Sequence, residues 1–268
     1  MMSARLCSAF VGVALFSLLG CEDPKAKWEE KAKSQTADAA LQLAALTPPP
    51  SVEEAGVAPS AAPKKKECGP ANEVGTLAPE LETAVRAKIT KKPNEAITIS
   101  DLAQLKSVRL TDAKLESLDP CFFPKLTGLH FLYLGKGEYD DLSPIASLTK
   151  LETLVAFANN VRDIHPLEKM TILDQLDLSR TPVADLSPIA GLKNVTELSL
   201  DDTQVRDLAP LSGYAKLQTL SIKRTLVTDL SPLRELKKLK RLSIGGTTIN
   251  DTSALQSLVA GGLKIDTK

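Results

Sequence analysis

Four cysteines and two histidines are the side chains in this sequence best suited to nucleophilic or metal-binding chemistry. The histidines, His130 and His165, are far apart, and neither Cys68 nor Cys121 has a histidine near it in the sequence. A nucleophilic cysteine needs such a base, and a zinc site needs ligands at short, regular spacings. The sequence also lacks a phosphate-binding loop. It therefore predicts no catalytic residues, no metal site and no cofactor, and it disfavours an enzyme.

Composition narrows the remaining classes of protein. The chain has 268 residues, of which 43% are hydrophobic and 25% charged, and this is enough apolar material for a sizeable core. Its 33 lysines and arginines balance 33 aspartates and glutamates, whereas a general nucleic-acid binder needs a basic excess. Aromatic residues make up only 4% of the chain, so the core must be aliphatic. We therefore expect an aliphatic domain that does not bind nucleic acid.

The first twenty residues have the pattern of a targeting signal. Arg5 precedes an apolar run from Leu6 to Leu19, which is too short to span a bilayer as a mature helix. The run ends in Leu18-Leu19-Gly20-Cys21, which resembles the lipobox of bacterial lipoprotein precursors. That resemblance implies removal of residues 1–20, acylation of Cys21 (palmitate is one such group) and a membrane-anchored protein, which we expect in the outer membrane, facing the periplasm or the cell surface. The alternative is an ordinary secretory signal with a chance cysteine.

Export would leave Cys68 and Cys121 as the two remaining thiols, because Cys7 departs with the signal and Cys21 carries lipid. In an oxidising compartment a disulfide between them would attach the end of the preceding segment to the first repeat. Two separate thiols are the alternative.

Composition also separates residues 21–78 from the rest of the chain. Residues 47–66 hold five prolines and no aromatic residue, and such a segment cannot bury enough surface to offset its ordering entropy. We predict a lipidated, disordered tether over 21–78. Beyond it, Leu81, Val85 and Ile89 have helical spacing, and residues 97–99 have the pattern of a short strand. We predict an N-terminal cap over 79–104 with a helix over 79–92.

An aliphatic pattern with a period of 22 residues occupies the remaining chain. The leucines that define it are Leu132, Leu154, Leu176, Leu198, Leu220 and Leu242. An apolar residue follows each of them two positions later, which is the alternation of a short strand. Further apolar columns bring the chain back beneath these strands. With an earlier unit over 105–118, the sequence predicts about seven coils of a solenoid whose strands form one parallel sheet.

The unit Leu-x-x-Leu-x-Leu-x-x-Thr-x-Val-x-Asp-Leu-Ser-Pro-Leu resembles the leucine-rich repeat, in its 22-residue internalin-like subclass. The resemblance covers residues 79–268 and implies an α/β solenoid with a parallel sheet on its concave face. It also implies 3₁₀ or short helical turns on the convex face and repeats over 105–268 that end in a truncated cap. The family often has asparagine in the turn after the strand, where it bonds the backbone of neighbouring coils. Here that position holds Gly137, Asn159, Thr181, Thr203, Thr225 and Thr247, so we expect a thinner hydrogen-bond ladder.

The motif Asp-Leu-Ser-Pro recurs at residues 141–144, 185–188 and 229–232. We expect its serine to be the N-cap of a short turn and its proline to be the first residue of that turn. His165 takes the serine position in Asp163-Ile164-His165-Pro166, so we predict a structural histidine and not a ligand.

Residues that alternate with the strand leucines are predicted to face the concave side, which is the usual partner-binding surface of this family. Along the chain they run from aromatic through acidic to basic: Phe131, Tyr133, Thr153, Val155, Phe157, Gln175, Asp177, Glu197, Asp201, Lys223 and Arg241. Exposed aromatic side chains on a rigid sheet anchor interfaces, and flanking charges orient the partner. The alternatives are rings covered by the cap or by neighbouring side chains, and an ordinary polar surface.

These patterns favour a membrane-anchored, non-enzymatic module that binds a protein, or in second place a glycan, on its concave face. A structural envelope protein without a dedicated ligand is the second hypothesis. Fold alone does not choose between them.

Overall fold

The computed structural model describes Cys68, Val74, Leu77 and residues 79–89, 91–92, 94–110 and 115–268. The predicted signal peptide, the acylated Cys21 and almost all of the predicted tether over 21–78 lie outside these residues. Every element described here belongs to the unit Lys64–Lys268. Among the described residues, no helix has the length and apolarity that a membrane span requires.

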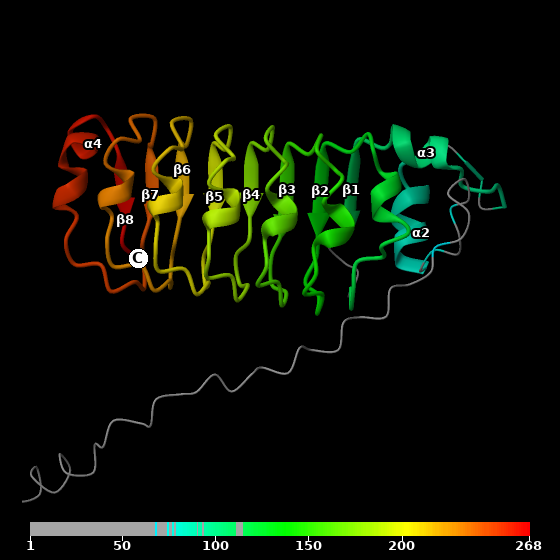
Figure 1. The fold of residues 1–268 in the computed structure, drawn as a ribbon, viewed down its shortest axis with the longest axis horizontal. Coiled ribbons are helices and arrows are strands. Elements are labelled where there is room, and N and C mark those ends of the chain that lie inside the picture. Colours follow the sequence, from blue (N-terminus) through cyan, green and yellow to red (C-terminus); the bar gives the residue numbers. More distant parts are fainter. Residues whose placement is uncertain are drawn as a thin grey trace, which may run out of the picture. The chain divides into compact units, whose positions relative to one another are not determined.

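Eight parallel strands form one sheet in strict chain order (Figure 1). The strands are β1 (Ser107–Leu110), β2 (Phe131–Leu134), β3 (Thr153–Ala156), β4 (Gln175–Asp177), β5 (Glu197–Ser199), β6 (Thr219–Ser221), β7 (Arg241–Ser243) and β8 (Lys264–Asp266). From β2 to β7, register partners are 22 residues apart, so that Leu132 pairs with Leu154 and Leu154 with Leu176. The repeat in the sequence is therefore the register of the sheet.

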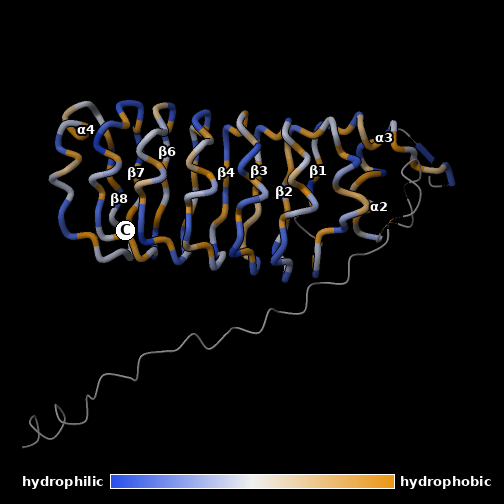
Figure 2. The backbone as a smooth tube through the Cα atoms, viewed as in Figure 1, coloured by the Kyte–Doolittle hydropathy of each residue, from blue (hydrophilic) through white to orange (hydrophobic). Residues whose placement is uncertain are grey.

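Leucine, isoleucine and valine side chains fill the interior of each coil. The strand residues Leu132, Leu154 and Leu220 are all 0% exposed, and they belong to one continuous apolar cluster that extends from Leu77 to Leu263. Figure 2 shows hydrophobic residues at recurring positions of successive coils. Complete burial of such a side chain contributes about 1.5–3 kcal/mol. Since each coil covers the apolar edge of the next, stability comes from stacking and not from any single coil.

A 3₁₀ turn stands between successive strands. These turns are η1 (Phe123–Lys125), η2 (Ser143–Ile145), η3 (His165–Leu167), η4 (Ser187–Ile189), η5 (Ala209–Leu211), η6 (Ser231–Leu233) and η7 (Ser253–Leu255). After η7 the last coil forms helix α4 (Gln256–Ala260) and then β8, which pairs with β7.

The prediction that serine caps these turns is wrong. Ser143 is the first residue of η2, and its N–H donates to Oδ1 of Asp141 at 2.7 Å. The same bond recurs from Ser187 to Asp185 at 2.8 Å and from His165 to Asp163 at 2.9 Å. An aspartate side chain can accept the backbone N–H of the residue two positions ahead. The serine already lies inside the turn, where its hydroxyl is less well placed to accept a free N–H. The motif Asp-Leu-Ser-Pro is therefore an aspartate-capped turn.

The N-terminal cap consists of two helices, α2 (Pro79–Arg86) and α3 (Ile99–Gln104). Helix α2 ends before the predicted residue 92, and the strand predicted over 97–99 does not form. Thr98 is instead the N-cap of α3: its hydroxyl accepts the N–H of Asp101 at 3.3 Å, and the Asp101 carboxylate accepts the N–H of Thr98 at 2.7 Å. This reciprocal capping box outweighs the strand preference of the β-branched residues beside it.

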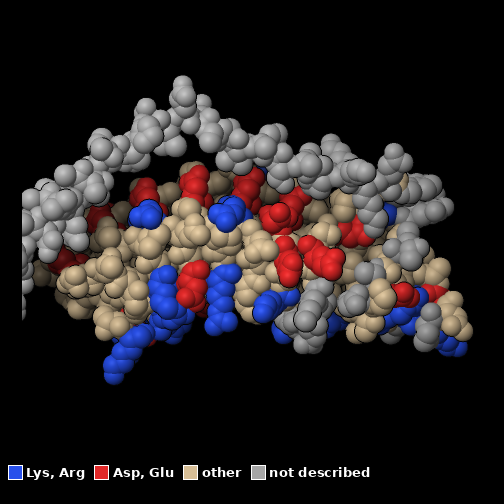
Figure 3. Space-filling model, turned by 90° about the horizontal axis from the view of Figure 1, so that it is seen from below, with Lys and Arg blue, Asp and Glu red and all other residues tan. Residues whose placement is uncertain are grey.

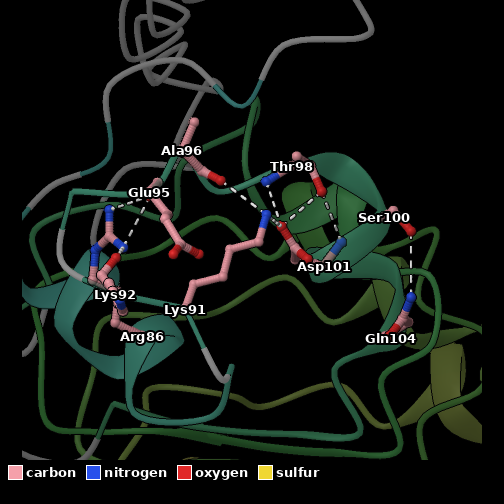
Figure 4. Close-up of polar contacts among 9 residues, drawn as sticks. All are labelled: Arg86, Lys91, Lys92, Glu95, Ala96, Thr98, Ser100, Asp101 and Gln104. Atoms are coloured by element: carbon pink, nitrogen blue, oxygen red, sulfur yellow. Dashed lines mark hydrogen bonds and ion pairs between the residues drawn. The ribbon is translucent and has the colours of Figure 1, made fainter.

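Polar contacts join the two cap helices through the segment between them (Figure 4). The Lys91 ammonium donates to Asp101 at 2.5 Å and to the carbonyl oxygen of Ala96 at 3.0 Å. The Arg86 guanidinium donates to the carbonyl oxygens of Lys92 and Glu95 at 3.0–3.2 Å. The hydrogen bonds from Lys91 and Thr98 lower the pKa of Asp101 to about 2.

Cys68 and Cys121 are joined by a disulfide with an S–S distance of 2.01 Å. Cys121 lies just before η1, and the N–H of Cys121 donates to Asp119 at 2.8 Å. The bond therefore ties residue 68, which precedes the cap, to the first coil, which follows it. At the same end of the solenoid, the chain passes so close to α3 that a Cβ atom on Gly128 would collide with the carbonyl oxygen of Ala103.

Candidate functional site

A recurring turn holds the end of each central strand. The third residue after β4 and after β5 takes a left-handed backbone, with φ of 58° at Arg180 and 56° at Asp202. The next residue is a buried threonine whose hydroxyl donates to the carbonyl oxygen three residues earlier, as from Thr203 to Leu200 at 2.7 Å. The partner of this hydroxyl lies in the same coil. The short threonine side chain reaches only its own turn.

Asn159 shows what the threonines lack. Its Nδ2 donates to the carbonyl oxygen of Ala156 at 2.8 Å and to the Tyr139 hydroxyl at 3.0 Å, and its Oδ1 accepts the N–H of Val161 at 2.9 Å. The buried threonines Thr181, Thr203 and Thr225 make only the first of these three bonds. The turns with threonine are thus held by fewer hydrogen bonds, as the sequence predicts. The sheet that carries the concave face is nevertheless continuous.

Aromatic side chains occupy the sheet at β2 and β3. Phe131 is 37% exposed, which is high for so large an apolar side chain, and Tyr133 and Phe157 are half-buried. The Arg109 guanidinium lies over the Tyr133 ring, 4.2 Å from its centroid, an attractive cation–π arrangement. The cap therefore does not cover Phe131, and the rings present apolar surface on a sheet of fixed geometry.

Two neighbouring residues that we predicted for this surface differ in their exposure. Thr153 is 5% exposed and its hydroxyl donates to Gln175 at 3.4 Å, so it offers little surface to a partner. Its register neighbours on either side, Phe131 and Gln175, are longer and cover it. Val155, the register partner of Tyr133, is half-buried and extends the apolar surface.

Carboxylates follow on β4 and β5, but two of them hold the local backbone. Asp177 accepts the N–H of Ser179 at 2.9 Å, and Asp201 accepts the N–H of Lys223 at 2.8 Å. The Glu197 side chain is exposed, and its carboxylate makes no hydrogen bond or ion pair with another described residue. Of the acidic residues predicted for the site, Glu197 is thus the one whose charge is fully available.

Basic side chains lie after β6 and on β7 and β8. Lys223 pairs with Asp266 at 3.1 Å, and the Arg241 guanidinium donates to the Thr219 hydroxyl at 3.1 Å. Arg241 is the register partner of Lys264, which the sequence analysis missed. The last unit is one residue longer than the period, so counting in steps of 22 does not reach Lys264. The signal for it was the strand pattern of residues 263–265.

A second group of charges lies along the edge where the strands end. The Arg224 guanidinium pairs with Asp202 in two contacts, one of them at 2.6 Å, and Arg180 lies 3.8 Å from the same carboxylate. The hydrogen bonds from Arg224 lower the pKa of Asp202. These residues, with Thr203 and Gln204, line an open hollow of about 470 Å³. Figure 3 shows this edge, where acidic side chains form a row along the solenoid and basic and acidic side chains alternate in a group below the row.

The histidines make local contacts. Nδ1 of His130 lies 2.8 Å from Glu152, and Nδ1 of His165 lies 2.6 Å from Asp163 on an exposed turn. The hydrogen bond to Asp163 raises the pKa of His165. Among the residues that the structure describes, no three side chains of His, Cys, Asp or Glu are grouped so that they could hold a metal ion.

Solved structures with the same fold include two internalins from Listeria monocytogenes. One is 28% identical with a TM-score of 0.64, over 70% of this chain and 55% of that protein; the other, internalin C2, is 26% identical with a TM-score of 0.60, over 71% and 93%. A leucine-rich repeat protein of Leptospira interrogans, 23% identical with a TM-score of 0.51 over 63% and 50%, shares the fold. No protein-family model and no curated protein matches the chain.

This chain therefore spans about half the length of the first of these proteins. The likenesses, together with the eight-stranded parallel sheet and its 3₁₀ turns, confirm the predicted solenoid: residues 79–268 contain an internalin-like leucine-rich repeat domain.

Proposed function

We propose that this protein is a lipid-anchored, non-enzymatic module of the bacterial envelope that binds a protein on the concave face of its sheet. The single observation that carries the proposal is the aromatic surface on β2 and β3, where Phe131 stays 37% exposed on a rigid scaffold. Large apolar side chains of this kind anchor interfaces because they bury much area at a low cost in conformational entropy. A role that required only a spacer would favour a polar surface at these positions.

The anchoring part of the proposal rests on the sequence Leu18-Leu19-Gly20-Cys21 and on the apolar run before it. Several acyl chains on one cysteine give stable attachment, since each buried methylene contributes about 0.8 kcal/mol. The modified protein would hang from the outer membrane, with residues 22–78 as its tether and the concave face free for a partner.

Metabolic labelling with an alkyne analogue of palmitate tests this anchor. Cys21→Ser should abolish labelling and release the protein from the membrane fraction. Cys7→Ser is the matched control, because Cys7 would depart with the signal, and it should label like the wild type. Equal labelling of wild type and Cys21→Ser would refute the anchor.

Crosslinking in intact cells, followed by mass spectrometry, tests the binding surface. The double substitution Tyr133→Ala and Phe157→Ala should reduce capture of the partner ten-fold or more, because each removes an interface anchor. Ile172→Ala is the control, since Ile172 is 44% exposed but lies in the turn that precedes β4. Circular dichroism should show that all variants are folded. Equal capture by the double variant would refute the concave site, and repeated absence of any partner would favour a purely structural envelope protein.

A further inference from the structure

The charges of the concave face are separated along the solenoid. Arg241 and Lys264 lie side by side as register partners on β7 and β8, and both are exposed. Lys240, the residue before Arg241, is exposed as well. None of the three forms an ion pair with another described residue, whereas Lys223 nearby is neutralised by Asp266. Like charges directly opposite each other on one sheet face are destabilising. The protein therefore carries a repulsive cluster, Lys240, Arg241 and Lys264, that an anion would relieve; we call it the basic end.

The opposite charge lies two strands away. Glu197 on β5 belongs to the same column of the sheet as Arg241, with Thr219 between them. Adjacent strands are about 4.8 Å apart, so the backbones of Glu197 and Arg241 are about 10 Å apart across the sheet, and those of Glu197 and Lys264 about 14 Å. The Arg241 guanidinium donates to the Thr219 hydroxyl between them, and among the described residues Glu197 forms no ion pair with the basic end. The concave face thus presents a negative group at β5 and a positive group at β7 and β8.

The apolar surface completes a line. Phe131 on β2 lies in the same column, three strands before Glu197, at about 14 Å. The column thus presents an apolar, a negative and a positive group in this order along the solenoid axis. An extended polypeptide rises about 3.3–3.4 Å per residue, so about four of its residues cover three strands.

We infer that the concave face receives an extended polypeptide segment laid across the strands. The segment carries an apolar side chain over β2–β3, a basic side chain about four residues further, over β5, and acidic side chains about three or four residues beyond that, over β7–β8. This inference rests on the proposed function and adds the chemistry and spacing of the ligand. A uniform polyanion does not fit, because Glu197 would repel the part of it that lies beyond the basic end.

Selection of random 15-residue peptides displayed on phage, against the purified full chain, tests this inference. Wild type should enrich peptides with the spacing apolar, basic, acidic. The charge reversal Lys240→Glu, Arg241→Glu and Lys264→Glu should weaken these peptides ten-fold or more and should enrich peptides whose acidic residues have become basic. Binding by the wild type should also fall as salt rises, because exposed charges are screened.

The control is the triple substitution Lys169→Glu, Lys237→Glu and Lys238→Glu. These lysines are exposed, they lie in turns outside the strands, and the change in net charge is the same. The control should retain the wild-type selection. Retention of the acidic preference by the reversed variant, equal loss in the control, or a library without any binder would each overturn the inference.

The same selection separates this inference from the proposed function. If the selected peptides no longer bind the Tyr133→Ala and Phe157→Ala variant but show no charge pattern, the concave binding site is supported. The proposed ligand chemistry is then refuted. Peptides that bind regardless of the aromatic and the charged substitutions refute both.

Discussion

Replacing Thr203 with asparagine tests how the turns after the strands are held together. The Thr203 hydroxyl donates to the carbonyl oxygen of Leu200 at 2.7 Å, while the N–H of Val205 has no hydrogen-bond partner among the described residues. In the coil of Asn159, the corresponding N–H, that of Val161, donates to the asparagine Oδ1 at 2.9 Å. An asparagine at 203 would keep the existing bond through Nδ2 and add the missing acceptor.

The expected gain follows from these two bonds. An intramolecular hydrogen bond contributes about 0.5–1.5 kcal/mol net, and an unpaired buried polar group costs about 1–3 kcal/mol. The preceding residue has φ of 55° at Ala158 and 56° at Asp202, so the backbones of the two turns match at this residue. We expect Thr203→Asn to raise the free energy of unfolding by about 1 kcal/mol, which corresponds to a rise in melting temperature of about 2–4 °C.

Urea denaturation followed by circular dichroism measures the effect. Thr203→Val is the matched control: it keeps the shape, removes the donor to Leu200, and should cost about 1–3 kcal/mol. The reverse change, Asn159→Thr, should also destabilise the protein. If Thr203→Asn lowers stability or leaves it unchanged while Asn159→Thr costs nothing, the turn bonds do not act as described.

Three further predictions concern the N-terminal end. Cys121→Ser removes the disulfide to Cys68, which closes a separation of 53 residues, and should lower the free energy of unfolding by about 4 kcal/mol in the loop-entropy model; denaturation with and without reductant measures it. The pKa of Asp101 is about 2, below its ordinary 3.8, so its stabilising contribution is complete above about pH 4 and is lost as pH falls through 2; amide exchange in the cap should accelerate over this window in wild type and not in Asp101→Asn. Gly128→Ala forces the chain away from the Ala103 carbonyl and should lower the melting temperature, and an unchanged value would contradict the close approach.

Much of the fold follows from local patterns in the sequence. The spacing of leucines fixed the strands, their order and the core, because a parallel solenoid stacks each coil on the one before and turns sequence period into register. The aromatic, acidic and basic order of the concave residues followed from the same register, since alternate residues of a strand face the same side. The structure describes these residues in that order, from Phe131 to Arg241.

The secondary-structure predictions were wrong where two local interactions compete for the same residues. Residues 97–99 have β-branched side chains, yet Thr98 caps a helix, because the reciprocal bonds with Asp101 satisfy two backbone N–H groups that a strand at this position would leave free. In the repeat motif, we predicted the serine to be the N-cap. Asp141, two residues before the turn, instead accepts the N–H of Ser143.

The sequence by itself determined the period, and with it the strands, the apolar interior and the face on which each strand residue lies. Only the tertiary structure decided which charges on that face are paired. Lys223 pairs with Asp266, which lies 43 residues further along the chain. Arg241 and Lys264 are register partners because the final coil departs from the 22-residue period. Periodicity places a residue in a column, but neutralisation depends on which side chains from distant coils come within a few ångströms of it.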